Sequence, residues 1–135
     1  MNCKNLINSS MAVLGTGITY LIGGWDASMK ILAIFIIADY ITGVMKSAKN
    51  KKIDSSVGFS GLLKKAAIFI VIIIAHQLDM VVSGGSPIFR TMAAYFYIAN
   101  EGISIMENIS LLGVDLPPFL VDALQKVKND NGATH

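Results

Sequence analysis

Two carboxylates inside apolar segments are the groups of this 135-residue chain best placed to do chemistry. Asp39 lies within the apolar stretch 28–45, and Glu101 lies within the stretch 87–108. Neither has a lysine or arginine close by in sequence, and each lies about 10 Å from the same end of its segment at 1.5 Å per helical residue. Two carboxylates in hydrocarbon cannot both stay charged without water or a partner, so we expect them to be protonated, to share a proton or to face a water-filled space. The sequence therefore predicts that both carboxylates lie at similar depth in the membrane and that they are candidate functional groups.

The segment 87–108 carries a polar stripe along its whole length. On a helical wheel most of its polar residues fall, with Ala93, within an arc of about 120°: Arg90, Tyr97, Asn100, Glu101, Ser104, Glu107 and Asn108. Such a stripe either lines water or forms a polar seam packed inside a helical bundle, and the sequence leaves both open. With Asp39, the pore-lining or assembly candidates are Asp39, Tyr97, Asn100, Glu101, Ser104, Glu107 and Asn108.

Asp79 and Arg90 flank a short turn at Ser83–Pro87. In an antiparallel hairpin they lie at the same depth, so we expect them to form an ion pair near one membrane surface; the alternative is that both reach lipid headgroups. His76 precedes Asp79 by one helical turn, which permits a metal or proton-relay interpretation. The sequence offers no third ligand, so His76 is expected to be a hydrogen-bonded packing residue.

The composition predicts an all-α integral membrane protein that positions these groups. Hydrophobic residues make up 53% of the chain and charged residues 15%, whereas soluble domains average about 25% charge. We expect a bundle of three to four transmembrane helices within residues 1–110, with spans near 7–25, 28–45, 66–82 and 87–108. The first stretch is diluted by glycine and hydroxyl residues, so a surface-lying helix is its alternative. Residues 111–135 should form a short cytoplasmic amphipathic helix with a disordered polar tail.

A basic connection between the second and third apolar segments sets the expected topology. It holds six of the eleven basic residues of the chain, and such clusters are retained in the cytoplasm. The C-terminus then lies in the cytoplasm and the Ser83–Pro87 turn lies outside. Anionic lipid explains these lysines better than nucleic acid does. The topology-setting residues are Lys46, Lys49, Lys51, Lys52, Lys64 and Lys65.

The sequence contains no motif typical of an enzyme. It has no phosphate-binding loop and no nucleophile with an accompanying base, and Cys3 is the single cysteine, so no internal disulfide or cysteine-based metal site is possible. We expect no catalytic residue, no metal and no cofactor. The N-terminus lacks a small-residue cleavage site, so a cleaved signal peptide is not expected.

Four segments of the chain resemble the small phage holins that include clostridial toxin-secretion holins. They are ADYITGVMK (38–46), GLLKKAAIF (61–69), AHQLD (75–79) and, most specific, YFYIANEGISIMEN (95–108). The resemblance runs from about the second span to Pro117. It implies a protein that assembles with copies of itself in the bacterial cytoplasmic membrane and opens a lesion through which an endolysin or a toxin leaves the cell. The endolysin is then released cargo, and direct binding to it is not implied.

Three other functions remain open on the sequence alone. A small-ion channel or proton-coupled carrier would use Asp39, His76 and Glu101 as a relay. An accessory membrane subunit would anchor a partner and would permeabilise nothing by itself. An antiholin, which restrains lysis, has no distinguishing sequence feature.

Overall fold

The computed structural model describes residues 2–132, and the side chains of residues 2–130. Over that range the regular structure consists of five helices: α1 (Cys3–Ile22), α2 (Ala27–Lys49), α3 (Ser55–Val82), α4 (Ile88–Leu111) and α5 (Pro118–Gly132). The predicted all-α fold is confirmed. The final residues of the polar tail, 133–135, lie outside the described part, whereas Asn129 and the residues up to 132 belong to α5.

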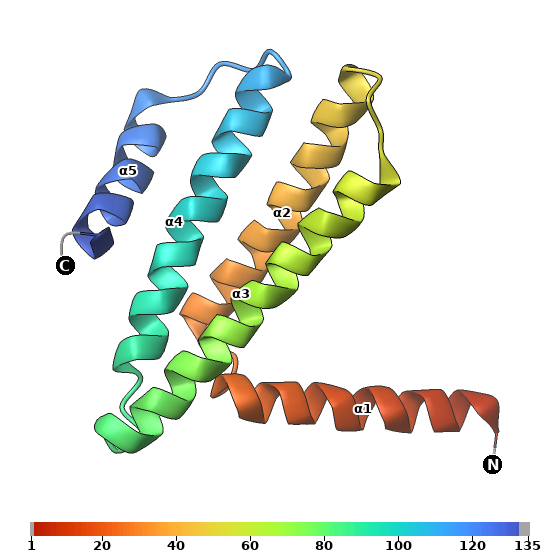
Figure 1. Cartoon of the computed structure of the whole chain (residues 1–135), viewed down its shortest axis with the longest axis vertical. Coiled ribbons are helices and arrows are strands. Elements are labelled where there is room, and N and C mark those ends of the chain that lie inside the picture. Colours follow the sequence, from red (N-terminus) through yellow and green to blue (C-terminus); the bar gives the residue numbers. More distant parts are fainter. Residues whose placement is uncertain (1, 133–135) are drawn as a thin grey trace.

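Helix α4 occupies the centre of the molecule. It packs against α2, α3 and α5, with α2 and α4 running in the same direction and α3 and α5 running against them (Figure 1). The buried core lies where α2, α3 and α4 meet the end of α1. Its members are Ile22, Met29, Leu32, Ile36, Ile68, Ile72 and Ala94.

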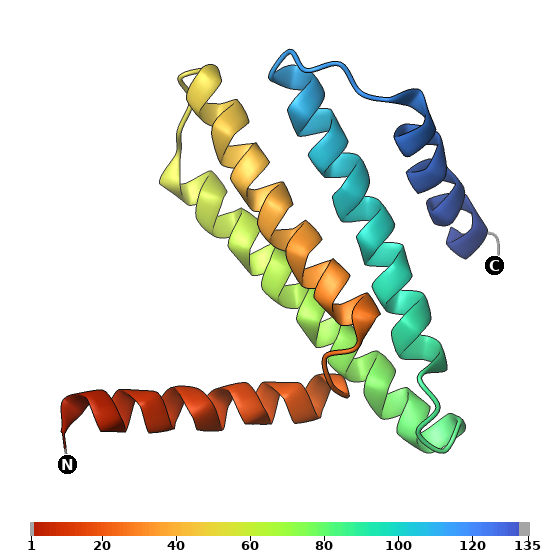
Figure 2. The same cartoon turned by 180° about the vertical axis from the view of Figure 1, so that it is seen from behind.

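Helix α1 stands apart from this bundle. It leaves the bundle at a steep angle from the end where α3 turns into α4, and both views show it extending away from the other helices (Figure 2). Ile22, its last residue, is its one buried residue. The chain reverses after Ile22 through Gly23, whose φ of 83° is in the left-handed region that favours glycine.

Aspartate side chains cap the N-termini of two of the helices. Asp26 accepts a hydrogen bond from the backbone N–H of Met29 at the start of α2, and Asp54 accepts one from Ser56 at the start of α3. The cap at Asp54 starts α3 well before the apolar run at 66–82 from which the third span was predicted. Helix α3 is therefore 28 residues long, and the glycine- and serine-rich stretch before Lys64 is part of it.

Helices α2 and α3 are long and apolar enough to cross a membrane. Large apolar side chains on their outer faces are exposed, among them Ile34, Ile37, Ile70 and Ile74. Exposed apolar surface of this extent is typical of a protein whose solvent is lipid. Length and apolar character thus support a membrane protein, and the expected total of three to four spans stays a prediction.

Candidate functional site

Three charged side chains meet between α2, α3 and α4. The Lys65 ammonium of α3 lies 2.6 Å from Oδ2 of Asp39 on α2 and 2.8 Å from Oε2 of Glu101 on α4. The three side chains are only 11–14% exposed. Charges removed from water persist when they are paired and hydrogen-bonded, and one cation here serves two carboxylates. We call Asp39, Lys65 and Glu101 the charged cluster.

Lys65 is the residue that sequence reasoning missed at this site. It was assigned to the basic connection, and both carboxylates were expected to lack a basic partner. That expectation was wrong because α3 begins at Ser55, so Lys65 lies about 15 Å along the helix at 1.5 Å per residue. The N-cap sequence Asp54-Ser55-Ser56 is the signal that could have revealed the early start.

Asn108 extends the charged cluster toward the C-terminal end of α4. Its side-chain amide donates to Oδ1 of Asp39 at 3.1 Å and to Oγ1 of Thr42 at 3.0 Å. Gly43 lies beside this amide, because a Cβ there would be in van der Waals contact with the Asn108 side-chain nitrogen, at 3.8 Å. Asp39 therefore accepts hydrogen bonds on both carboxylate oxygens.

The polar stripe of α4 faces several neighbours in the folded chain. Glu101 and Asn108 are buried against α2 and α3, whereas Glu107 is exposed. Tyr97, Asn100 and Ser104 are half-buried. Within one chain, part of the stripe thus forms a polar seam inside the bundle, which is one of the two arrangements that the sequence left open. Whether any part of the stripe lines water in an assembly stays a prediction.

A second polar centre lies at the opposite end of the bundle, around Arg90. Its guanidinium lies 2.6 Å from Oδ2 of Asp26 and donates to the backbone carbonyls of Ile22 and Gly24. Arg90 is 2% exposed, and the hydrogen bonds of its guanidinium all go to the joint between α1 and α2. Arg90 thus links the start of α4 to that joint.

The expected ion pair between Asp79 and Arg90 is corrected by this geometry. The two residues do meet at equal depth, but the Asp79 carboxylate accepts from the backbone N–H groups of Phe89 and Arg90, at 2.8 and 3.0 Å. Asp79 thereby caps the first turn of α4, where N–H groups have no partner within the helix. The guanidinium is left to pair with Asp26, a residue that sequence reasoning did not select.

Asp26 carries a shifted pKa outside the apolar segments. Partial burial raises the pKa of its carboxyl, but hydrogen bonds from Arg90, Met29 and Ser28 and the charge of Arg90 outweigh burial and lower it to about 2. His76 packs against the same joint, since a Cβ at Gly23 would stand 2.6 Å from its Nδ1. His76 therefore lies with the second polar centre, away from the charged cluster.

The basic connection lies beside the C-terminal end of α4. The Lys49 ammonium donates to the carbonyl of Leu111 at 3.3 Å, where it caps the last turn of α4. Lys51, Lys52 and Lys64 are exposed, and Lys46 is half-buried. Apart from Lys49 and Lys65, the lysines proposed to set the topology are therefore available to lipid headgroups or water.

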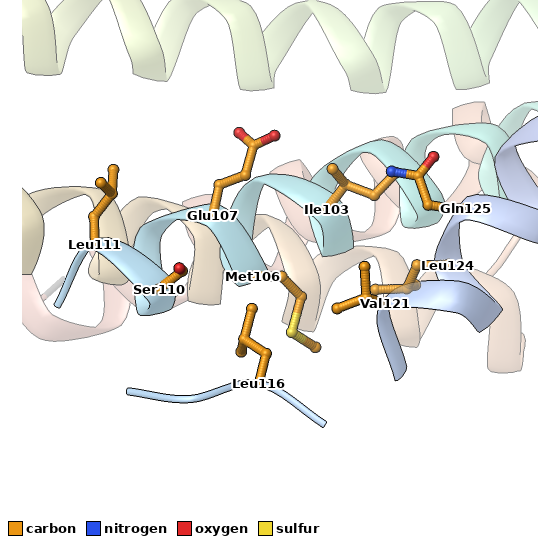
Figure 3. Close-up of a pocket in the computed structure, with 9 residues that line it drawn as sticks. All are labelled: Ile103, Met106, Glu107, Ser110, Leu111, Leu116, Val121, Leu124 and Gln125. Carbon is orange, nitrogen blue, oxygen red and sulfur yellow. The ribbon is translucent and has the colours of Figure 1, made fainter. Parts of the chain in front are cut away.

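A groove of about 440 Å³ separates α4 from α5 (Figure 3). Leu116, Val121 and Leu124 line it from the side of the C-terminal segment, and Ile103 and Met106 from α4. Glu107 and Gln125 bring polar groups to its edge, and Glu107 points away from Met106 and Leu116 in the close-up. Beyond the groove the fit is tight, because a Cβ at Gly102 would stand 2.9 Å from a methyl carbon of Leu124.

Comparison with known proteins gives a consistent result. A family described as the bacteriophage holin family matches residues 16–129. A protein named "Probable holin" from Bacillus phage phi105 is 36% identical over 104 residues, which cover 76% of each chain. An uncharacterised protein of Clostridium perfringens is 45% identical over 125 residues and 93% of each chain, and the uncharacterised YqxH of Bacillus subtilis is 38% identical over 112 residues, 82% of this chain and 78% of its own. No solved structure matches the chain.

Proposed function

Because the chain belongs to the bacteriophage holin family, we propose that it assembles with copies of itself in the bacterial cytoplasmic membrane and opens lesions that release an endolysin. The observation that supports this most directly is the distribution of charge on the folded chain. Lys65 lies between the carboxylates of Asp39 and Glu101 inside the bundle and offsets part of their charge, while α2 and α3 present apolar side chains outward. Such a chain is soluble in lipid as a monomer and retains polar groups on α4 for contacts in an assembly.

We propose that α2, α3 and α4 span the membrane. Helix α4 is held between two apolar helices, although its polar stripe lowers its own hydropathy. The basic connection then faces the cytoplasm and the Asp79–Arg90 end faces outward. Helix α1 leaves that outer end at a steep angle to the other helices, which favours the surface-lying alternative and an external N-terminus (Figure 2).

A proton relay through Asp39, His76 and Glu101 has less support. Lys65 contacts both carboxylates, and His76 lies about 16 Å from Lys65 along α3 at 1.5 Å per residue. His76 packs against Gly23 instead. The three groups of the suggested relay are thus divided between the two polar centres.

Induced expression in bacteria tests the proposed function. We expect an abrupt loss of membrane potential and viability, with clearing of the culture when an endolysin is co-expressed. An ion channel would dissipate the potential without clearing the culture, and an anchoring subunit or an antiholin would do neither when expressed alone. Retention of cytoplasmic enzymes and of full viability at high expression would overturn the proposal.

Glu101→Gln is the matched variant for this test. It keeps the shape of the side chain but removes one of the two negative charges that share Lys65, so the balance between packing inside the chain and contacts in an assembly should change. We expect a shifted time of lysis at equal protein level. Asp115→Asn, at an exposed position in the connection before α5, is the control for a lost carboxylate away from the cluster.

A further inference from the structure

Helix α5 is polar, yet it lies alongside α4, which is unfavourable if lipid surrounds that side of the chain. After Leu111 the chain turns back, and α5 runs antiparallel to α4 and ends beside the middle of that helix (Figure 1). Leu124 contacts Gly102, which lies about 13 Å from the C-terminal end of α4 at 1.5 Å per residue. The part of α5 that follows Leu124 lies deeper still, because the two helices run in opposite directions.

This deep part of α5 is the charged part. It carries Lys126, Lys128 and Asp130, and Asp122 precedes Leu124; all four side chains are exposed. Charged groups at this depth are costly in hydrocarbon. The apolar contacts of Leu116, Val121 and Leu124 with α4 do not compensate, because apolar groups gain no hydrophobic free energy by leaving lipid for protein.

The contact between α5 and α4 is nevertheless a close one. A Cβ at Gly102 would stand 2.9 and 3.0 Å from the two methyl carbons of Leu124 and 3.1 Å from the ring of Phe35. The missing side chain of Gly102 lets Leu124 of α5 and Phe35 of α2 approach α4 this closely. The contact surface for α5 on α4 is therefore specific in shape, although the charged side chains of α5 require water around it.

We propose that α5 docks on α4 where that side of the protein faces water, so that docked α5 forms part of the wall of the lesion. This inference rests on the proposed function. In a sealed membrane α5 lies at the cytoplasmic surface, and it folds down along α4 as neighbouring chains open an aqueous space. The charged cluster stays paired inside each chain. The side chains that face the aqueous space are Glu107 of α4 and the exposed residues Asp122, Lys126, Lys128 and Asp130 of α5.

Cross-linking of the α4–α5 contact tests this proposal with the full chain. The variant carries Gly102→Cys and Leu124→Cys in a background in which the exposed Cys3 is replaced by serine. It is reconstituted into anionic liposomes loaded with a fluorescent protein, at a low protein density that leaves them sealed and at a high density that makes them leak. We expect the 102–124 disulfide to form at least about tenfold faster in leaking liposomes. In sealed liposomes the docked position would put the charges of α5 into hydrocarbon, and the free-energy cost for even one charge is enough to lower the docked population by that factor.

Gly43→Cys with Asn108→Cys is the matched control pair. It joins α2 to α4 inside the bundle, where a Cβ at Gly43 would stand 3.8 Å from the Asn108 side-chain nitrogen, and should cross-link equally at both densities. In leaking liposomes the 102–124 disulfide should leave protein release at least as fast as in the reduced sample. Each cysteine variant alone shows whether a substitution, and not the link, alters release.

Two results would overturn the inference. Equal rates of 102–124 cross-linking at both densities would mean that docking does not depend on an aqueous space. Loss of protein release on oxidation, restored by a reductant, would mean that α5 must leave α4 for lesions to open. If the parent chain releases no protein at any density, the proposed function itself fails, and the inference fails with it.

Discussion

Lys65 should be the single most important side chain for the stability of the bundle. Replacing it by methionine keeps the length of the side chain but leaves Asp39 and Glu101 without their counter-ion. Both carboxylates lie within hydrogen-bonding distance of the same nitrogen, so in the variant they also face each other as like charges. The variant must then bury two unpaired carboxylates or protonate them.

The expected loss follows from the burial of the cluster. With 11–14% exposure of the three side chains, solvent screens the interaction weakly. Removal of one partner from a buried ion pair costs about 3–5 kcal/mol, because an uncompensated charge remains. We expect Lys65→Met to lower the free energy of unfolding by this amount. Lys64→Met, at the exposed neighbouring position, should change it by no more than about 0.5 kcal/mol.

A neutral version of the cluster distinguishes charge from packing. Lys65→Met combined with Asp39→Asn and Glu101→Gln removes all three charges and preserves an oxygen at position 39 that can accept from Asn108. Neutral replacements of buried ion pairs are often harmless or stabilising by about 1–4 kcal/mol, so most of the lost stability should return.

Titration with sodium dodecyl sulfate in mixed micelles measures these differences. Unfolding is followed by far-UV circular dichroism and by the fluorescence of Trp25, the single tryptophan. The reasoning is refuted if Lys65→Met unfolds at the same detergent fraction as Lys64→Met. It is also refuted if the triple variant is as unstable as Lys65→Met alone.

Two further predictions concern the second polar centre, around Arg90. The pKa of Asp26 is lowered from 3.8 to about 2 in the folded chain, so its contribution to stability is complete above about pH 4 and is lost as the pH falls through about 2. Asp26→Asn should therefore be less stable than the parent at neutral pH, and the difference in their free energies of unfolding should disappear as the pH falls from about 4 to about 2. Asp122→Asn should unfold like the parent at every pH. Gly23→Ala should destabilise the chain by about 1–3 kcal/mol because of its positive φ and the His76 ring, whereas Gly15→Ala, with open space around it inside α1, should stabilise by up to about 1 kcal/mol; equal effects of the two alanines on the unfolding midpoint would contradict the packing of His76 at the joint.

Most of the helices, and the relative heights of Asp79 and Arg90 along them, were predictable from local patterns; the start of α3, and with it the position of Lys65, was not. Apolar runs of span length, the glycine-rich turn at Ser83–Pro87 and the helical spacing of Leu120, Leu124 and Val127 each depend on neighbours in sequence. Equal distance from the turn was likewise enough to place Asp79 and Arg90 at one depth. Depth along a helix axis follows from a count of residues, so these predictions required no knowledge of the packing.

The partners of the charges were not predictable in the same way. Whether Asp79 meets the guanidinium of Arg90 or its backbone depends on the rotation of α4 about its axis, which is set by α2, α3 and the joint at Gly23. Asp26 enters the second polar centre because α1 ends against α3, where the Arg90 guanidinium reaches both Ile22 and Asp26. Contacts of this kind join residues more than sixty positions apart, such as Arg90 and Asp26, and no local pattern encodes them.

The polar stripe of α4 shows the limit most clearly. Periodicity placed its residues on one side of a helix, but periodicity is identical for a seam packed inside a bundle and for a face that lines water. The physical difference lies in the counter-ions: Glu101 has Lys65 within reach, whereas Glu107, on the same stripe, is exposed. A stripe that contains both kinds of site divides into a part that holds the chain together and a part that is left for other contacts. That division follows from the packing of α3, which places Lys65 beside Asp39 and Glu101 and so determines which carboxylate of α4 has a cation next to it.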